Sequence, residues 1–150
     1  MTKQNVVTDV ENKIKHFKSK ADHNKNESLR SFKLIMLSSV LAPIFIAYGT
    51  GDIWGKIIPS LLSCLGAFLT AWLQLRKPNQ LWTLYRTSQR EIESELQLYS
   101  FEAGKYKDIE HKDEALIESV NEIYLKTNNG WSALVPNKED INSIEANKES

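Results

Sequence analysis

The side chains that could do chemistry in this 150-residue chain are few and widely spaced. Its three histidines do not match the ligand spacing of a zinc site. The single cysteine, Cys64, lies within an apolar run, where a thiol behaves as a small hydrophobe rather than a nucleophile. The carboxylates of Glu91 and Glu95 are one helical turn apart, which is more typical of a solvated or salt-bridged helix face than of catalysis. We therefore expect no enzymatic activity, no metal and no cofactor.

Two uncharged apolar runs, residues 34–48 and 57–75, occupy the middle of the chain and flank a short glycine-rich loop. A membrane-spanning helix needs about 20 apolar residues. The second run meets this length, and the first does so if its flanking residues are counted and Lys33 extends to the lipid headgroups. Two core helices of a soluble bundle are the alternative, but such helices carry a polar stripe that these runs lack. The sequence predicts a transmembrane hairpin with spans at about 32–49 and 57–75.

Basic residues mark the side of the membrane on which each end of the hairpin should lie. Lysines and arginines recur between residues 18 and 33 and between residues 76 and 90, whereas the loop contains only Lys56. Because cytoplasmic flanks are enriched in lysine and arginine, we expect a multi-pass protein of the cell membrane with both termini in the cytoplasm. The formal net charge of +0 gives no basic excess that would indicate nucleic-acid binding.

The segment before the hairpin has an apolar residue every three or four positions from Val7 to Ala21, which predicts a cytosolic amphipathic helix. Thr8 fits a capping box at its start, and the polar residues 22–26 are expected to interrupt it. A second capping box at Asn24 would then begin the helix that enters the membrane.

Two further cytosolic helices are expected after the hairpin, at about residues 79–103 and 109–126. Gly104 is predicted to cap the first of them, and the residues before Trp131 are predicted to stop the second, so that Trp131 folds back. The predicted fold is an all-α membrane protein: a two-helix transmembrane hairpin with one N-terminal and two C-terminal cytosolic helices. We expect a single domain over residues 1–136 and a polar tail over residues 137–150.

The second span carries small and hydroxyl-bearing side chains at helical spacing, among them Ser60, Ser63 and Thr70. Two interpretations are open. Hydroxyls on one face could line a pore, and small residues on one face could equally let two helices pack closely in lipid.

A more specific pattern follows the hairpin and reads W-x-x-Y-R-x(4)-E-x(3)-E-x(3)-Y-x(4)-G-x-Y. Together with the two-span hairpin, this pattern resembles the SLATT family of small two-transmembrane bacterial proteins with cytosolic helices. The resemblance extends over about residues 25 to 130. The residues that carry it are Trp82, Tyr85, Arg86, Glu91, Glu95, Tyr99, Gly104 and Tyr106.

The resemblance implies an effector that forms a membrane pore in bacterial conflict systems and permeabilises the cell's own membrane during phage attack. It implies a homo-oligomer in the lipid bilayer and a partner protein that synthesises or senses a nucleotide, because this chain has no fused sensor domain. A membrane-anchored scaffold, whose cytosolic helices recruit a partner, is the alternative. Within the family motif we expect Arg86 to form an ion pair with Glu114 or Glu118 of the last helix.

Overall fold

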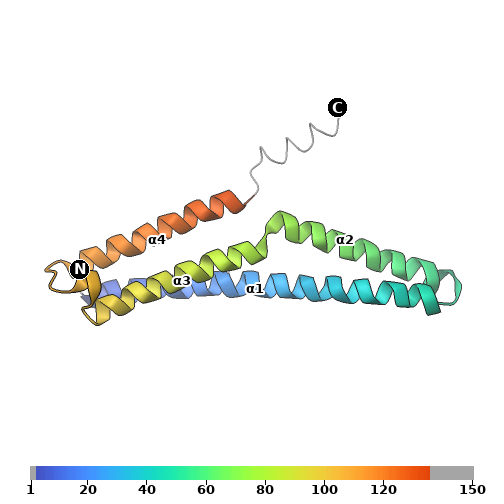
Figure 1. The fold of residues 1–150 in the computed structure, drawn as a ribbon, viewed down its shortest axis with the longest axis horizontal. Helices are drawn as coiled ribbons and strands as arrows, with labels where there is room; N and C mark the ends of the chain where they lie inside the picture. The colour runs from blue at the N-terminus through green and yellow to red at the C-terminus, as the bar shows by residue number, and fades with distance from the viewer. Residues whose placement is uncertain (1–2, 136–150) are drawn as a thin grey trace, which may run out of the picture. The chain divides into compact units, whose positions relative to one another are not determined.

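The computed structural model describes residues 3–135, which are almost entirely helical and contain no β-strand (Figure 1). The predicted polar tail, residues 137–150, lies outside the described residues. The all-α class is confirmed, and two stretches of helix are long and apolar enough to cross a membrane by length and composition. In chain order the elements are α1 (Lys3–Tyr48), a π-helix (Ile53–Ile57), α2 (Ile58–Arg76), α3 (Pro78–Ser100), a 3-10 helix (Gly104–Tyr106) and α4 (Lys112–Leu134).

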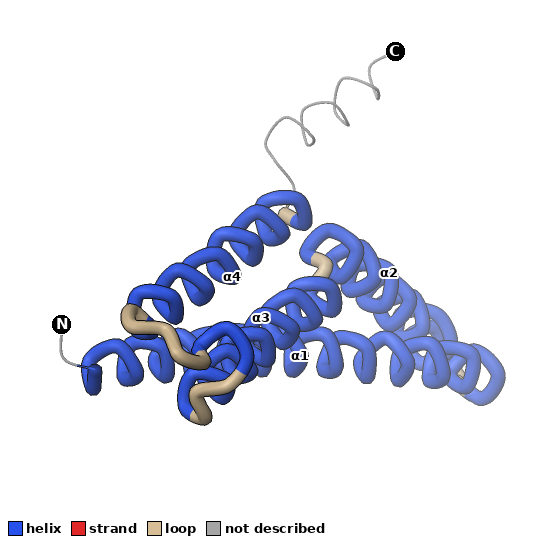
Figure 2. Tube along the Cα trace, turned by 60° about the vertical axis from the view of Figure 1, so that its left-hand side comes forward, coloured by secondary structure: helices blue, strands red, loops and turns tan. Residues whose placement is uncertain are grey.

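The helices, which short loops connect (Figure 2), form two compact units. The bundle unit consists of residues 3–24 and 79–134, and the hairpin unit consists of residues 25–78. Helix α1 contributes its first part to the bundle unit and its second part to the hairpin unit.

Helix α1 continues without a break through the polar residues 22–26, so the predicted interruption is wrong. Thr8 and Asn24 lie inside the helix rather than at a helix start, and the Asn24 side-chain amide donates a 2.8 Å hydrogen bond to the carbonyl oxygen of Lys20. Asparagine and aspartate cost a helix interior less than 1 kcal/mol each. Burial of Ala21 and Asn24 within the same turn offsets that cost. The helix therefore continues through a segment whose residues have low helix propensity.

Helix α3 ends at Ser100, three residues before the predicted end. The N–H of Ala103 donates to the Leu98 carbonyl at 2.9 Å, and Glu102 takes the left-handed conformation with φ of 50°. This is the hydrogen-bond pattern of a Schellman cap, with Glu102 in the position where glycine is usual. Gly104 is therefore not the cap of α3. It has a φ of 58° and is the first residue of the 3-10 helix.

Helix α4 runs to Leu134, so the predicted stop before Trp131 and the predicted fold-back are wrong. Gly130 lies where α4 meets α3: a Cβ atom there would be 2.9 Å from Cδ1 of Leu84. The glycine that suggested a helix end is thus a point of close helix packing.

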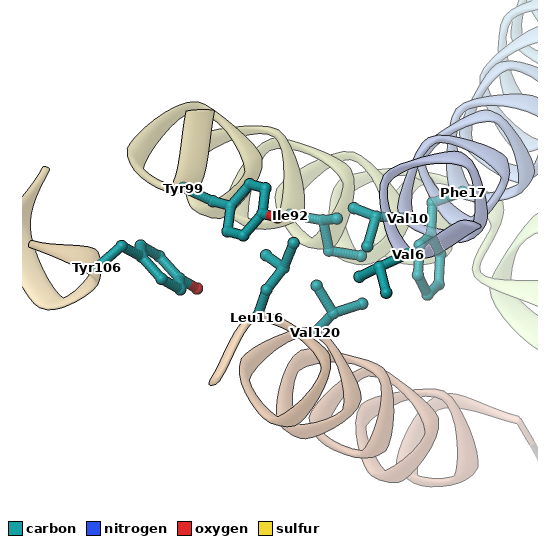
Figure 3. Close-up of a cluster of buried hydrophobic side chains, with 8 residues drawn as sticks. All are labelled: Val6, Val10, Phe17, Ile92, Tyr99, Tyr106, Leu116 and Val120. Carbon is teal, nitrogen blue, oxygen red and sulfur yellow. The ribbon is translucent and has the colours of Figure 1, made fainter. Parts of the chain in front are cut away.

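The core of the bundle unit is formed by apolar side chains from α1, α3, α4 and the 3-10 helix, which Figure 3 shows converging. The predicted apolar seam of α1 is confirmed at Val10, Phe17 and Ala21, which are buried. Fully burying a large aliphatic side chain contributes about 1.5–3 kcal/mol, so this cluster is the main source of the unit's stability. The buried members are Val6, Val10, Phe17, Ile92, Tyr99, Tyr106, Leu116 and Val120.

In the hairpin unit a glycine turn and the π-helix connect the second part of α1 to α2. A Cβ atom at Gly49 would lie 2.6 Å from the carbonyl oxygen of Trp54, so only glycine fits there. Beside the turn, the rings of Phe45 and Trp54 pack with centroids 5.9 Å apart. Pro59 occupies the first turn of α2, where its missing N–H costs little.

Candidate functional site

A groove of about 380 Å³ lies in the hairpin unit between the second part of α1 and α2. Two predicted residues, Ser63 and Thr70, line it from α2, and Ser38 and Ser39 line it from α1. The helices approach closely here, because a Cβ atom at Gly66 would lie 3.9 Å from Cβ of Ser38. The arrangement therefore combines close helix packing with four hydroxyl groups in one groove.

The hydroxyl groups of the three predicted α2 residues donate hydrogen bonds to backbone carbonyl oxygens of the same helical segment. Ser60 donates to Lys56 at 2.7 Å, Ser63 to Pro59 at 2.8 Å, and Thr70 to Gly66 at 2.8 Å. In the groove wall formed by α1, Ser39 donates to Ile35 at 2.8 Å. Each oxygen still has a lone pair for a further donor such as water.

All three residues are exposed, but Ser60 does not line the groove, which separates it from Ser63 and Thr70. The three residues had been grouped because they lie on one broad small-residue face of the span. In the structure only part of that face lines the groove against α1.

Large apolar side chains of the hairpin unit point away from this groove and are exposed. Leu37 and Val40 of α1 are 55% and 57% exposed, and Leu61 and Phe68 of α2 are each 64% exposed. Only 11% and 6% of the two most apolar windows is buried within the chain, whereas the core helix of a soluble protein is mostly buried. The described residues leave this apolar surface uncovered.

A polar cluster joins α2 near its end to α1 within the hairpin unit. Glu27 Oε1 accepts a hydrogen bond from Trp72 Nε1 at 3.3 Å and pairs with Arg76 Nε at 3.2 Å. The Arg76 guanidinium also lies 5.9 Å from the centre of the Trp72 ring, a cation–π distance. Basic residues from position 76 onward had been expected to flank the second span, and the cluster adds Trp72 and Glu27, which the sequence did not single out.

The last part of the family motif is brought together in the bundle unit, where α3 connects to α4. Tyr106 donates a 2.6 Å hydrogen bond to Glu95 Oε2, which Lys105 also approaches at 2.9 Å. Tyr99 donates to Asp113 Oδ1 at 2.5 Å, and its ring meets that of Tyr106 edge-on at 5.8 Å.

Burial and then these hydrogen bonds raise the pKa of both phenols. The pKa of Tyr99 rises from 10.0 to about 12 through burial first and the bond to Asp113 second. The pKa of Tyr106 also rises to about 12, through burial first and the bond to Glu95 second. Both phenols therefore stay protonated near neutral pH and act as donors that fix the α3–α4 connection.

The first part of the motif lies further along α3. Tyr85 packs against Phe17 with ring centroids 6.1 Å apart, Trp82 is half-buried, and Glu91 pairs with Lys126 at 3.1 Å. These contacts hold α3 to α1 and α4 within the bundle unit.

The predicted ion pair between Arg86 and Glu114 or Glu118 is wrong. Arg86 Nη1 instead donates to Oε1 of Gln89 at 2.9 Å, and the nearly buried Gln89 donates in turn to Glu93 at 2.6 Å. The guanidinium thus reaches a carboxylate of its own helix through a buried amide. The spacing of three and then four residues along α3 was the signal that could have indicated this chain of bonds.

Comparison with known proteins places the whole hairpin unit and the motif in one family. No curated protein and no solved structure matches the chain. Residues 13–114, more than half of the chain, match a family described as "Protein of unknown function (DUF4231)". This match includes α2, α3 and every residue of the motif through Tyr106. The chain is therefore a member of the DUF4231 family.

Proposed function

We propose that this protein is an integral membrane effector whose hairpin crosses the bilayer twice and whose copies assemble into a pore. The observation that carries the proposal is the exposed apolar surface of both hairpin helices, of which the chain itself buries only 11% and 6% over the most apolar windows. Lipid hydrocarbon, or the same surface of other copies, would remove it from water. Both termini would lie in the cytoplasm, as the basic flanks of the hairpin indicate.

Pore formation requires more than one copy, because two helices cannot enclose a channel. The groove hydroxyls of Ser63 and Thr70 would then supply acceptors for water along a narrow path. The resemblance to the SLATT family supports a role in a nucleotide-linked bacterial defence system, with a separate protein that makes or senses the nucleotide. Opening of the pore would permeabilise the cell membrane.

A second function, a membrane-anchored scaffold, is favoured by a different observation. Ser63, Gly66 and Thr70 face α1 of the same chain, and the hydroxyls of Ser63 and Thr70 donate to their own helix. Close packing within one hairpin is sufficient to explain such residues. In this proposal the hairpin only anchors the bundle unit, which would recruit a partner.

Dye leakage from liposomes that contain the purified protein separates the two functions. Replacing both Ser63→Ala and Thr70→Val removes the groove hydroxyls with little change in volume, and Ser60→Ala is the matched control outside the groove. The pore proposal expects leakage from the wild type and from the control, and at least tenfold less from the double variant. Cross-linking on the same samples verifies that the oligomer is intact.

Two results would count against a pore lined by the groove. Undiminished leakage from an intact oligomer of the double variant would remove Ser63 and Thr70 from the conduction path. Wild-type protein that oligomerises but does not leak, even with candidate partners added, would favour the scaffold. The membrane topology is tested separately by a reporter placed at Thr50, expected outside, and by terminal reporters, expected in the cytoplasm. A secreted terminal reporter would contradict the orientation.

A further inference from the structure

A second cavity, of about 240 Å³, opens in the bundle unit among α1, α3 and α4. It shares no residue with the hairpin groove or with the Tyr99–Tyr106 cluster. The residues that matter most to its chemistry are His16, Phe17, Lys20, Tyr85, Tyr124 and Trp131.

The cavity wall is largely aromatic. The Phe17 ring lies 6.1 Å from the Tyr85 ring and 5.8 Å from the Tyr124 ring, so three helices each contribute one ring to the same cluster. Trp131 adds an indole that is 41% exposed, and Tyr124 is 45% exposed. Aromatic rings with a free face stack on flat ligands in offset or edge-on geometry.

Every polar side chain of the cavity can donate a hydrogen bond, and none of the described residues that line it is acidic. Lys20 forms no ion pair with another described residue, whereas Lys105 and Lys126 of the same unit each pair with a carboxylate. The hydroxyls of Tyr85 and Tyr124 likewise form no hydrogen bond to another residue in the part of the chain that the structure describes. The Asn128 side chain adds an amide that can donate. A cavity with one cation, several hydrogen-bond donors and no carboxylate favours a ligand that carries an anionic group.

We propose that this cavity binds a small planar organic anion, with its ring against the aromatic wall and its charged group at Lys20. Its volume of about 240 Å³ is slightly below the roughly 300–1,000 Å³ of pockets for drug-sized ligands, so it suits one ring system with one charged substituent. A lipid acyl chain offers no flat face for the rings, and a peptide is too large to enter.

Such a ligand would contact three helices that belong to one unit, and its binding would stabilise that unit. A ligand that binds only the folded state raises the free energy of unfolding in proportion to the logarithm of its concentration. The site is independent of the proposed pore, since its residues lie in the bundle unit and it would exist equally in a scaffold.

The proposal is tested by titrating the purified full-length protein in a nonionic detergent with 1-naphthyl phosphate, in a calorimeter, against empty micelles. We expect saturable binding of one ligand per chain and an upward shift of the melting temperature. Lys20→Met should weaken binding at least tenfold. Lys20→Arg keeps the positive charge, so its affinity should be within about threefold of the wild-type affinity. Lys18→Met, on the same helix but outside the cavity, should change affinity less than twofold. Trp131→Leu, which removes a ring and leaves Lys20 in place, should also weaken binding.

Each component of the ligand has its own control. Inorganic phosphate that binds as tightly as 1-naphthyl phosphate would overturn the role of the aromatic wall. Equal affinity for uncharged 1-naphthol would overturn the role of Lys20. Absence of saturable binding, or identical affinities for Lys20→Met and wild type, would overturn the site itself.

Discussion

The hydroxyl of Tyr106 donates a 2.6 Å hydrogen bond to Glu95 Oε2, and the Tyr106 ring is only 1% exposed. Glu95 lies on α3 and Tyr106 on the 3-10 helix that precedes α4, so this bond fixes the connection between the two helices. Lys105 approaches the same carboxylate at 2.9 Å, which gives Glu95 two partners from the connection. The relationship explains why a glutamate and a tyrosine eleven residues apart can belong to one motif.

Tyr106→Phe should destabilise the bundle unit by about 1–2 kcal/mol, since a hydrogen bond to a charged group is worth more than a neutral one but Lys105 remains. Urea unfolding in detergent, followed by circular dichroism, measures the change. Tyr124→Phe is the control, because its ring is 45% exposed and its hydroxyl has no hydrogen bond to another described residue. Equal losses in the two variants would show that the bond to Glu95 contributes nothing specific.

Stability should fall as the pH rises from 10 to 12. Folding raises the pKa of Tyr99 and of Tyr106 from 10.0 to about 12, so the folded state holds these protons more tightly than the unfolded state. Their contribution is complete below pH 10 and is lost as the pH approaches 12. The unfolding midpoint in urea, measured at intervals over this range, should decline. The double variant Tyr99→Phe and Tyr106→Phe should decline less steeply, and an identical slope would assign the loss to other groups.

Cysteines placed at Ser38 and Gly66 should form a disulfide within one chain. A Cβ atom at residue 66 lies 3.9 Å from Cβ of residue 38, within the 3.5–4.5 Å that a disulfide requires. Cys64→Ala removes the native thiol, and mild oxidation followed by mass spectrometry of digested protein detects the bond. The pair Ser38→Cys and Ala71→Cys is the control, because Ala71 does not line the groove. Equal yields from the two pairs would mean that α1 and α2 have no fixed packing.

The effect of Gly130→Ala should depend on Leu84. Alanine is better than glycine in a helix interior by roughly 0.5–1 kcal/mol, but its Cβ would lie 2.9 Å from Leu84 Cδ1. When Leu84 is present, the stability gained from alanine should be cancelled because the leucine side chain must move. In the Leu84→Ala background the same substitution should increase stability. Denaturant unfolding of the four proteins gives the coupling energy, expected to be at least about 0.5 kcal/mol. A coupling near zero would mean that Gly130 does not pack on Leu84.

The parts of the fold that follow from periodicity could be predicted from the sequence. The two apolar runs predicted the helices of the hairpin unit, and the repeat from Val7 to Ala21 predicted the buried face of α1, where Val10, Phe17 and Ala21 are buried. Helix ends were predicted less well, because polar residues and Gly130 were read as local stops. Burial around Asn24 and Gly130 changes that outcome, and burial depends on helices that are distant in sequence.

The candidate sites were predictable where both partners lie on one helix or in one pattern. Glu95, Tyr99 and Tyr106 were identified together, although Asp113, which accepts the hydrogen bond from Tyr99, was not. For Arg86 the expectation of a partner on another helix was wrong, since a buried glutamine of the same helix is closer. The part of the groove wall that α1 forms could not be derived, because the rotation of one helix against another depends on packing that no single segment specifies.

The hydroxyls of α2 have a consequence for the order of events in a membrane. Because Ser60, Ser63 and Thr70 donate to carbonyl oxygens one turn earlier, none of the three carries a donor into lipid that needs a neighbouring chain. If the hairpin spans the bilayer as proposed, a newly made copy can insert alone and remain stable there. Insertion and assembly would then be separate steps. A cell could hold a reserve of harmless single copies, and the trigger would have only to bring them together.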